Sequence, residues 1–278
     1  MSSLETGVRR IYLLDFGILA GEPGWFVPNP MLYVEMGNVQ ELERKHKWIE
    51  IPVSGALVEH KDGYVLYDTG GHPEASKVWT QATFNAFPVV KFTENNRLEN
   101  QLKLVGLRPE DITYVVFSHM HLDHIGQAYL FKEAGVPLVV HKKELQHALY
   151  LYWMGKVGGY QPVDLEALKG ANWFPLDLPR FELLPGVELI WVGAHTPGSM
   201  MMKVTTDEGN TYVFTGDFTH IPQEIELESK GWLLGDFEEF LSGMKMLKLM
   251  LRRPRTQAIL GHDPHLWEKH PRAPKFLS

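Results

Sequence analysis

The sequence predicts an α/β (α+β) fold in which sheets pack face to face and helices cover their outer sides. Two observations favour it: predicted elements follow one another as strands, helix, strands, helix, and this order occurs in two similar halves. The 278 residues, 44% hydrophobic and 12% aromatic, are ample for a large core. No linker or low-complexity segment interrupts the chain, so we expect a single domain over residues 1–278.

The first half opens with an apolar strand over residues 11–17 and a Gly- and Pro-rich loop over 21–30. This loop carries Trp25 and Phe26, which either cap a pocket or pack under a strand. Strands over 51–60 and 64–67 form a hairpin through an Asp-Gly turn. Apolar spacing predicts the remaining elements of this half: a helix over 95–105, a strand over 112–117, a helix over 124–134, a strand over 137–141 and a helix from about 143.

The second half repeats the pattern. Apolar runs predict strands over 188–192, 200–205, 211–214 and 257–260, with an amphipathic helix over 237–251 between the last two. The run over 149–154 is too apolar for an ordinary exposed face. We expect a partner subunit, as in a homodimer, or the rest of the domain to cover it.

Charge and composition exclude several classes of function. The net charge is −7 and no long Lys/Arg block occurs, which disfavours nucleic acid as a partner. Cysteine is absent, so disulfides and thiolate ligands are excluded. The first ten residues lack the apolar segment of a signal peptide, and no window is long enough to span a bilayer. We therefore expect a cytoplasmic protein without a membrane partner.

The most informative stretch places His119, His121, Asp123 and His124 directly after a β-branched apolar strand. Three imidazoles and a carboxylate pack poorly in a core, because each buried polar group needs a partner. Imidazole nitrogen and carboxylate oxygen are ligands of divalent metals. The spacing allows the first two histidines to face one ion and the Asp-His pair to face a second.

Three further ligand-type residues stand just past predicted strands and close to a glycine: His195, Asp217 and His262. Loops at strand ends commonly form sites, and glycine lets the backbone turn sharply there. An ordinary turn residue is the alternative interpretation, above all for Asp217. Together with the first cluster, these residues predict one metal site built from four loops.

The residues quoted above, with Asp68-Thr69-Gly70, resemble the signature of the metallo-β-lactamase superfamily over roughly residues 11–265. Within that superfamily, residues 68–75 and Gly261-His262-Asp263 resemble the N-acyl-homoserine lactone lactonases. The resemblance implies a four-layer αββα sandwich.

The resemblance also implies roles. His119, His121 and His195 would hold one ion, Asp123, His124 and His262 the other, and Asp217 would bridge both. Zinc is expected first, with cobalt, manganese or iron as alternatives, because imidazole and carboxylate suit all of them. Asp68 would support a ligating imidazole from behind. Cysteine-containing β-lactamase sites are excluded.

The implied reaction is the opening of a small-molecule lactone by a metal-bound hydroxide, which is a quorum-quenching activity. Asp123 is the candidate proton shuttle, and a role as ligand alone is the alternative. The sequence departs from the lactonases at His220, three residues after Asp217, where those enzymes usually carry a tyrosine. His220 is expected to donate a hydrogen bond to the substrate carbonyl or to act as a general acid, and a structural histidine is the alternative.

Other functions stay open at this point. A lactonase or esterase for another compound, such as a pyridoxine-derived lactone, would fit the altered residue. A phosphodiesterase or nuclease is disfavoured by the acidic charge balance, and a non-catalytic metal module by the open positions of such a site. The extra histidines His60, His72 and His141 are expected to be packing or surface residues. Aromatic residues that would form an acyl-chain pocket, unless they serve packing or a dimer contact, are Trp25, Phe26, Phe84, Phe87, Tyr152, Trp153 and Tyr160.

Overall fold

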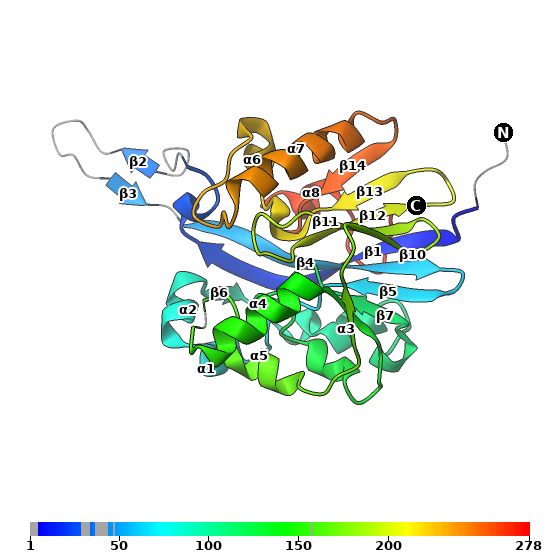
Figure 1. Cartoon of the computed structure of the whole chain (residues 1–278), viewed down its shortest axis with the longest axis horizontal. Coiled ribbons are helices and arrows are strands. Elements are labelled where there is room, and N and C mark those ends of the chain that lie inside the picture. Colours follow the sequence, from blue (N-terminus) through cyan, green and yellow to red (C-terminus); the bar gives the residue numbers. More distant parts are fainter. Residues whose placement is uncertain (1–4, 29–33, 37–43, 47, 157) are drawn as a thin grey trace.

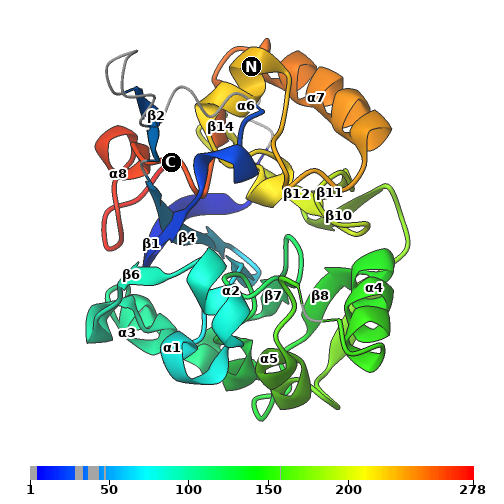
Figure 2. The ribbon, with the colours of Figure 1, turned by 90° about the vertical axis from the view of Figure 1, so that its left-hand side faces the viewer.

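The computed structural model describes residues 5–28, 34–36, 44–46, 48–156 and 158–278. Two sheets pack against each other, and helices cover the outer side of each sheet (Figures 1 and 2). This arrangement of helix, sheet, sheet and helix layers confirms the predicted αββα fold.

The first sheet has seven strands in the order β6-β1-β4-β5-β7-β8-β9. The hairpin of β4 and β5 is antiparallel as predicted, whereas β5, β7, β8 and β9 are parallel neighbours. The carboxyl ends of these parallel strands therefore meet at one edge. The strands are β1 (Val8–Gly21), β4 (Ile49–His60), β5 (Gly63–Tyr67), β6 (Val89–Lys91), β7 (Tyr114–Val116), β8 (Leu138–His141) and β9 (Trp173–Leu176).

The second sheet has the order β10-β11-β12-β13-β14. Its first four strands are antiparallel and the last two are parallel, so β11, β13 and β14 run in the same direction. The strands are β10 (Arg180–Leu184), β11 (Val187–Trp191), β12 (Met200–Thr205), β13 (Thr211–Phe214) and β14 (Thr256–Ile259), and β2 (Val34–Met36) pairs separately with β3 (Arg44–His46).

Helices form the outer layers, with α1 to α5 on the side of the first sheet and α6 and α7 on the side of the second (Figures 1 and 2). The α-helices are α1 (Ala75–Val78), α2 (Gln81–Ala86), α3 (Leu98–Lys103), α4 (Lys142–Trp153), α5 (Pro162–Ala167), α6 (Pro222–Leu227), α7 (Phe237–Leu251) and α8 (Leu266–Lys269). Short 3-10 helices are η1 (Pro23–Trp25), η3 (Glu94–Asn96), η4 (Pro109–Asp111), η5 (Ala128–Phe131) and η6 (Gly216–Phe218).

Side-chain alternation builds the cores. In β12, Met200 and Met202 belong to the cluster between the two sheets, whereas Met201 belongs to the cluster under α7. In α7, Phe240, Met244 and Leu247 recur at helical spacing and pack on the outer face of the second sheet. The amphipathic helix predicted over 237–251 is thus confirmed.

The helix predicted over 124–134 is wrong, because only η5 forms there. Backbone groups that would form the first turn of that helix bond to the neighbouring loop instead. Gly126 N–H donates to the carbonyl of Gly70, and Thr69 N–H donates to the carbonyl of His124. A side chain at Gly126 would collide with the backbone at His72, so the two loops approach closely. The helix predicted over 95–105 is shortened to α3, preceded by η3.

The loop predicted over 21–30 contains η1, and residues 29–30 lie outside the described residues. The apolar run on α4 stays largely uncovered, with Leu149, Tyr150, Trp153 and Met154 exposed. The rest of the domain does not cover them, and a homodimer that would do so stays a prediction. Within the described ranges, no helix has the length and apolar character to cross a bilayer, and the cytoplasmic location stays a prediction.

Candidate metal centre

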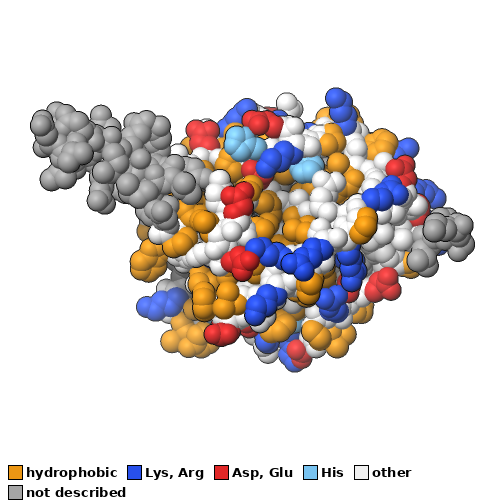
Figure 3. Space-filling view, turned by 90° about the horizontal axis from the view of Figure 1, so that it is seen from above, with side chains coloured by type: hydrophobic (Ala, Val, Ile, Leu, Met, Phe, Trp, Pro, Cys, Tyr) orange, Lys and Arg blue, Asp and Glu red, His pale blue; other side chains and the backbone are white. Residues whose placement is uncertain are grey.

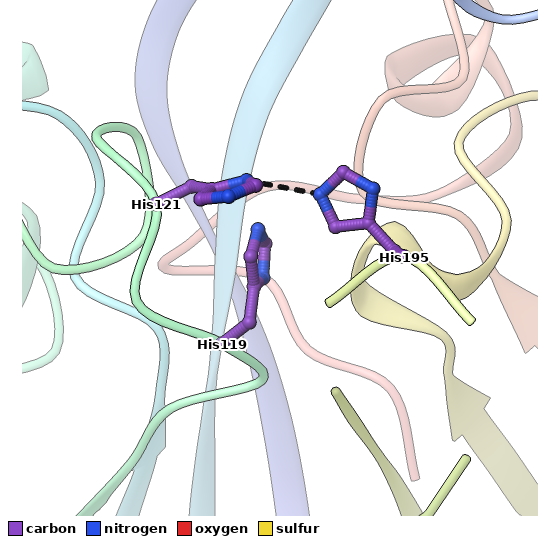
Figure 4. Close-up of side chains that lie close together, drawn as sticks. All are labelled: His119, His121 and His195. Atoms are coloured by element: carbon purple, nitrogen blue, oxygen red, sulfur yellow. Dashed lines mark hydrogen bonds between the residues drawn. The ribbon is translucent and has the colours of Figure 1, made fainter. Parts of the chain in front are cut away.

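Strand ends bring all seven predicted ligands together. His119, His121, Asp123 and His124 lie on the loop after β7, at the edge where the parallel strands of the first sheet end. The other three follow strands of the second sheet that run in a common direction: His195 follows β11, Asp217 lies in η6 after β13, and His262 follows β14. Figure 4 shows the rings of His119 and His121, from the loop after β7, and the ring of His195, from the loop after β11, pointing toward one another.

Asp217 lies at the middle of the cluster. Its Oδ1 is 3.2 Å from His124 Nε2 and 3.1 Å from His262 Nε2. Its Oδ2 is 3.7 Å from His119 Nε2 and 3.5 Å from His195 Nε2. The two oxygens of one carboxylate therefore face two separate groups of histidines.

The two remaining predicted ligands complete these groups. The Nδ1 atom of His121 is 3.0 Å from Nε2 of His195 (Figure 4). Asp123 lies 3.6 Å from His124 and 3.5 Å from His262. Each group thus gathers at least three ligand-type side chains, which is the minimum found at open catalytic metal sites.

Burial and charge set the protonation of the cluster. Burial lowers the pKa of His121 to about 4 and holds those of His119 and His195 well below the ordinary value. Burial by itself raises the pKa of Asp217, but His124, His220 and His262 outweigh it and hold that pKa well below its usual range. His119, His121 and His195 are thus neutral, which is the form that binds metals. Burial lowers the pKa of His124 and His262 too, but Asp217 and Asp123 outweigh it and raise both pKa values above the ordinary one, so a metal ion bound there would displace a proton.

Backbone carbonyls hold the ring orientation of two histidines. Nδ1 of His195 is 2.8 Å from the carbonyl of Leu233, and Nδ1 of His262 is 2.8 Å from the carbonyl of Pro52. A carbonyl can only accept, so both Nδ1 atoms donate and both Nε2 atoms are left with a free lone pair in the neutral ring.

The carboxylate of Asp68 likewise fixes ring orientation on the loop after β7. Its Oδ2 accepts from His124 Nδ1 at 2.9 Å and from Ser118 Oγ at 2.8 Å. Since the Ser118 hydrogen is used by Asp68, its oxygen accepts from His119 Nδ1 at 3.0 Å. The sequence reasoning placed Asp68 behind an imidazole but missed Ser118, which extends its influence to a second one.

Atoms that find no hydrogen-bond partner indicate what the site holds. Among the described residues, His119 Nε2, His124 Nε2 and Asp217 Oδ1 are buried and make no hydrogen bond. Such orphaned groups are costly unless something else satisfies them. Because all are lone-pair donors facing a common space, the residues fit divalent metal ions.

Glu144, which sequence reasoning missed, ties the two ligand loops together. The side chain is fully buried in the first turn of α4. Its Oε1 accepts from Met120 N–H and Tyr160 Oη, and its Oε2 accepts from Thr196 Oγ1 and Gly198 N–H. In sequence it looks like any acidic residue at a helix start, so no local pattern could have identified it.

An apolar cavity of about 350 Å³ opens onto the cluster. The rings of Trp25 and Phe87 form part of its wall, with centroids 5.2 Å apart, and Phe26 lies beside them. Asp123, His195, Asp217, His220 and His262 line its polar end. Trp25 and Phe26 thus line a pocket, as one predicted alternative had it, and Phe26 also packs in the core, as the other did.

The other predicted aromatics lie elsewhere. Phe84, Tyr152 and Trp153 do not line this cavity, and Tyr160 is a buried partner of Glu144. Among the described residues, His60, His72 and His141 belong to no group that could hold a metal. His60 contacts the carbonyl of Thr6, and the ring of His141 stacks on Trp191.

His220 is buried at the polar end of the cavity, with its Nε2 3.1 Å from Asp217 Oδ2. Its Nδ1 lies 3.0 Å from Oε1 of Glu224, a fully buried carboxylate at the start of α6. Sequence reasoning identified His220 but missed Glu224. The four-residue spacing between a loop residue and a helix start carried no recognisable pattern.

The family of the chain follows from its sequence. The profile described as "Metallo-beta-lactamase superfamily" matches residues 49–262, which include all seven clustered residues. The chain belongs to the metallo-beta-lactamase superfamily. It is similar to N-acyl homoserine lactonase AiiA of Bacillus thuringiensis subsp. kurstaki, with 28% identity over 246 residues that cover 86% of this chain and 92% of that protein. It is also 31% identical to N-acyl homoserine lactonase AiiB of Agrobacterium fabrum over 219 residues, 75% of this chain and 76% of that protein.

Solved structures of this superfamily share the fold. An N-acyl homoserine lactone hydrolase with the product N-hexanoyl-L-homoserine bound at its catalytic metal center has a TM-score of 0.79 at 24% identity, covering 97% of this chain and 99% of that one. A quorum-quenching N-acyl homoserine lactone lactonase has a TM-score of 0.78 at 25% identity, covering 99% and 100%. AidC, a dizinc quorum-quenching lactonase, has a TM-score of 0.65 at 19% identity, covering 97% and 96%.

Proposed function

We propose that this protein is a metal-dependent hydrolase that opens the lactone ring of N-acyl-homoserine lactones and so acts in quorum quenching. The observation that carries the proposal is the seven-residue cluster of His119, His121, Asp123, His124, His195, Asp217 and His262 at the end of an apolar cavity. An acyl chain suits the apolar wall, and the lactone then lies at the polar end. The names of the relatives AiiA and AiiB support this substrate class.

The cluster would hold two divalent ions, with zinc expected first. His119, His121 and His195 would hold one, Asp123, His124 and His262 the other, and Asp217 would contribute an oxygen to each. When bound, such ions lower the pKa of a coordinated water and polarise a substrate carbonyl. The dizinc relative AidC supports this choice, and cobalt, manganese and iron suit the same donors.

The reaction adds water across the ester bond of the ring and yields a carboxylate and a hydroxyl group. The ring oxygen must therefore gain a proton as its bond to the carbonyl carbon breaks. We assign this transfer to Asp123, and the position of its carboxylate in the cavity lining beside His124 and His262 supports the assignment. Trp25, Phe26 and Phe87 exclude water from the acyl side.

The direct test pairs metal analysis with a lactone assay. Purified protein is stripped with a chelator, assayed with N-acyl-homoserine lactones by base consumption, and assayed again after adding Zn²⁺, Co²⁺, Mn²⁺ or Fe²⁺. We expect activity to vanish on stripping and to return with about two equivalents of metal. A metal-loaded protein that leaves a panel of chain lengths intact would falsify the substrate assignment.

A second candidate is a lactonase or esterase for another compound, such as a pyridoxine-derived lactone. His220 favours it, since this residue departs from the lactonase pattern within the cavity. Comparing acyl lactones with aromatic lactones and aryl esters separates the two. A phosphodiesterase is disfavoured by the net charge of −7 and by the lack of a long Lys/Arg block in the sequence. On the face in Figure 3, basic side chains occur together with acidic and hydrophobic ones.

A further inference from the structure

His220 has the same surroundings as the histidines of the metal cluster. Its Nδ1 faces the buried carboxylate of Glu224 at 3.0 Å, and the backbone N–H of His220 donates to the other oxygen of that carboxylate. His195, His262 and His124 likewise present Nδ1 to a fixed acceptor. In each neutral ring this arrangement places the hydrogen on Nδ1 and leaves the lone pair on Nε2.

The free Nε2 of His220 points at the centre of the cluster. It lies 3.1 Å from Asp217 Oδ2, the same oxygen that faces His119 and His195. Donor atoms of His195, Asp217 and His220 all lie within 4.8 Å of one another. His220 therefore lies beside His195 and Asp217, the two residues through which it adjoins the group of His119, His121 and His195.

A carboxylate faces each ring nitrogen of His220, so either a proton or a metal ion must place positive charge between Nε2 and Asp217 Oδ2. A nitrogen lone pair and a carboxylate oxygen repel each other at 3.1 Å, and the low exposure of both residues prevents water from screening the repulsion. Lys230 Nζ donates its hydrogen bonds to the backbone carbonyls of Asp217 and Phe218, and no bond from it to the Asp217 carboxylate occurs among the described residues. A cation bound by both atoms removes the conflict.

We propose that His220 is an additional ligand of the ion held by His119, His121 and His195, and that Glu224 is the positioning residue that fixes its ring. The inference rests on the metal centre of the proposed function. A tyrosine-like role, in which the side chain donates a hydrogen bond to the substrate, needs a hydrogen on Nε2. In the neutral ring, Glu224 accepts a hydrogen from Nδ1, so Nε2 carries none.

The added imidazole changes which ions the site prefers. Four imidazoles and one carboxylate oxygen form a nitrogen-rich set, which favours Zn²⁺, Co²⁺, Ni²⁺ or Cu²⁺ over Mn²⁺. We expect Mn²⁺ to bind this position poorly and Co²⁺ to bind it tightly.

The test measures metal binding, not activity. Apo protein is titrated with Co²⁺ against a competing chelator, and visible absorption is recorded for the wild type, His220→Ala, His220→Tyr and Glu224→Gln. His147→Ala is the control, since His147 is a partly buried histidine that belongs to no metal-holding group of the described residues. Circular dichroism checks the fold of each variant.

We expect both His220 variants to bind one Co²⁺ equivalent about 100-fold more weakly, with a changed absorption spectrum, and the other equivalent normally. Glu224→Gln should weaken the same equivalent by roughly 10-fold, because loss of a group behind a ligand typically costs 10–100-fold. His147→Ala should match the wild type. Unchanged affinities and spectra in His220→Ala would overturn the inference.

A measurement on the wild type keeps the inference testable if the variants fail to fold. In the Co²⁺-loaded protein, each bound imidazole gives one exchangeable ring N–H resonance with a paramagnetic shift, from the nitrogen that does not bind the ion. We expect six such resonances, one for each of His119, His121, His124, His195, His220 and His262, and only five would contradict the role of His220. These readouts are independent of substrate, so a protein that binds metal in this way but opens no lactone refutes only the proposed function.

Discussion

The buried carboxylate of Glu144 accepts a hydrogen bond from Thr196 Oγ1 at 2.6 Å, and this contact joins the two loops that carry His121 and His195. On the other loop the same side chain accepts from Met120 N–H at 2.9 Å. One side chain on α4 thus sets the distance between ligands that come from different sheets. Gly198 has to be a glycine for this contact, because a Cβ there would lie 2.3 Å from that of Glu144.

We predict that Glu144→Gln weakens metal binding and lowers stability. The amide places an N–H₂ group against donors, so at least one buried donor loses its partner at a cost of about 1–3 kcal/mol. Metal affinity, measured against a competing chelator, should fall by roughly 10–100-fold. The matched control is Glu238→Gln, an exposed glutamate in the first turn of α7, which should change neither property.

We predict that Asp68→Asn weakens the binding of the ion beside His124 and leaves the backbone conformation unchanged. Asp68 has a φ of 60°, in the left-handed region that asparagine tolerates well. The substitution removes the charge that His124 Nδ1 and Ser118 contact. A chelator titration should show roughly a 10–100-fold loss. Equal affinities in wild type and variant would show that the carboxylate charge has no such role.

We predict that the loss of activity in Phe87→Ala depends on the acyl-chain length of the substrate. Phe87 lies against Trp25 in the cavity wall, so its removal takes away apolar contact with a long acyl chain. A buried aromatic side chain contributes about 1.5–3 kcal/mol, so kcat/KM for long-chain lactones should fall by roughly 10–100-fold. Short-chain lactones should be affected much less. Phe84→Ala, which removes a ring outside the cavity, should give no dependence on chain length.

We predict that Asp164→Asn stabilises the protein at alkaline pH. Asp164 is buried in α5, its two oxygens find no hydrogen-bond partner among the described residues, and burial raises its pKa from 3.8 to about 7. A carboxyl with a raised pKa favours the folded state when protonated, so its contribution is complete below pH 4 and is lost as pH rises through 7. A shift of about three units corresponds to about 4 kcal/mol.

The measurement is thermal unfolding of wild type and variant across pH. At pH 8 the Tm of Asp164→Asn should exceed that of the wild type by roughly 5–10 °C, and the difference should shrink toward pH 4. A Tm difference that does not change with pH would contradict the raised pKa of Asp164. The exposed substitution Asp62→Asn serves as the control.

The cluster could be predicted from the sequence because each of its loops directly follows an apolar run that forms a strand. His195, Asp217 and His262 each stand past an apolar run, and the sheets bring these run ends together. The same local reasoning failed over 124–134, where apolar spacing predicted a helix. There the Asp68–Gly71 turn takes the backbone hydrogen bonds that a helix would use, and only the tertiary structure reveals this competition.

The supporting carboxylates were out of reach for a different reason. Glu144 and Glu224 both lie at helix starts, where glutamate is common for electrostatic reasons alone. Each carboxylate supports the cluster because it is buried against a loop. That contact depends on tertiary packing, which no local sequence pattern reveals. Asp68 was identified only because the resemblance supplied its motif.

The order of the ligands along the chain has a consequence for synthesis in the cell. His119 leaves the ribosome first, but the group that includes His262 is complete only 143 residues later, which is on the order of 10 seconds at ordinary translation rates. Over that interval the nascent polypeptide exposes half of a chelating site. If the site holds the two proposed ions, loading of both must therefore await synthesis of the segment with His262, and metal supply becomes a step in the maturation of this protein.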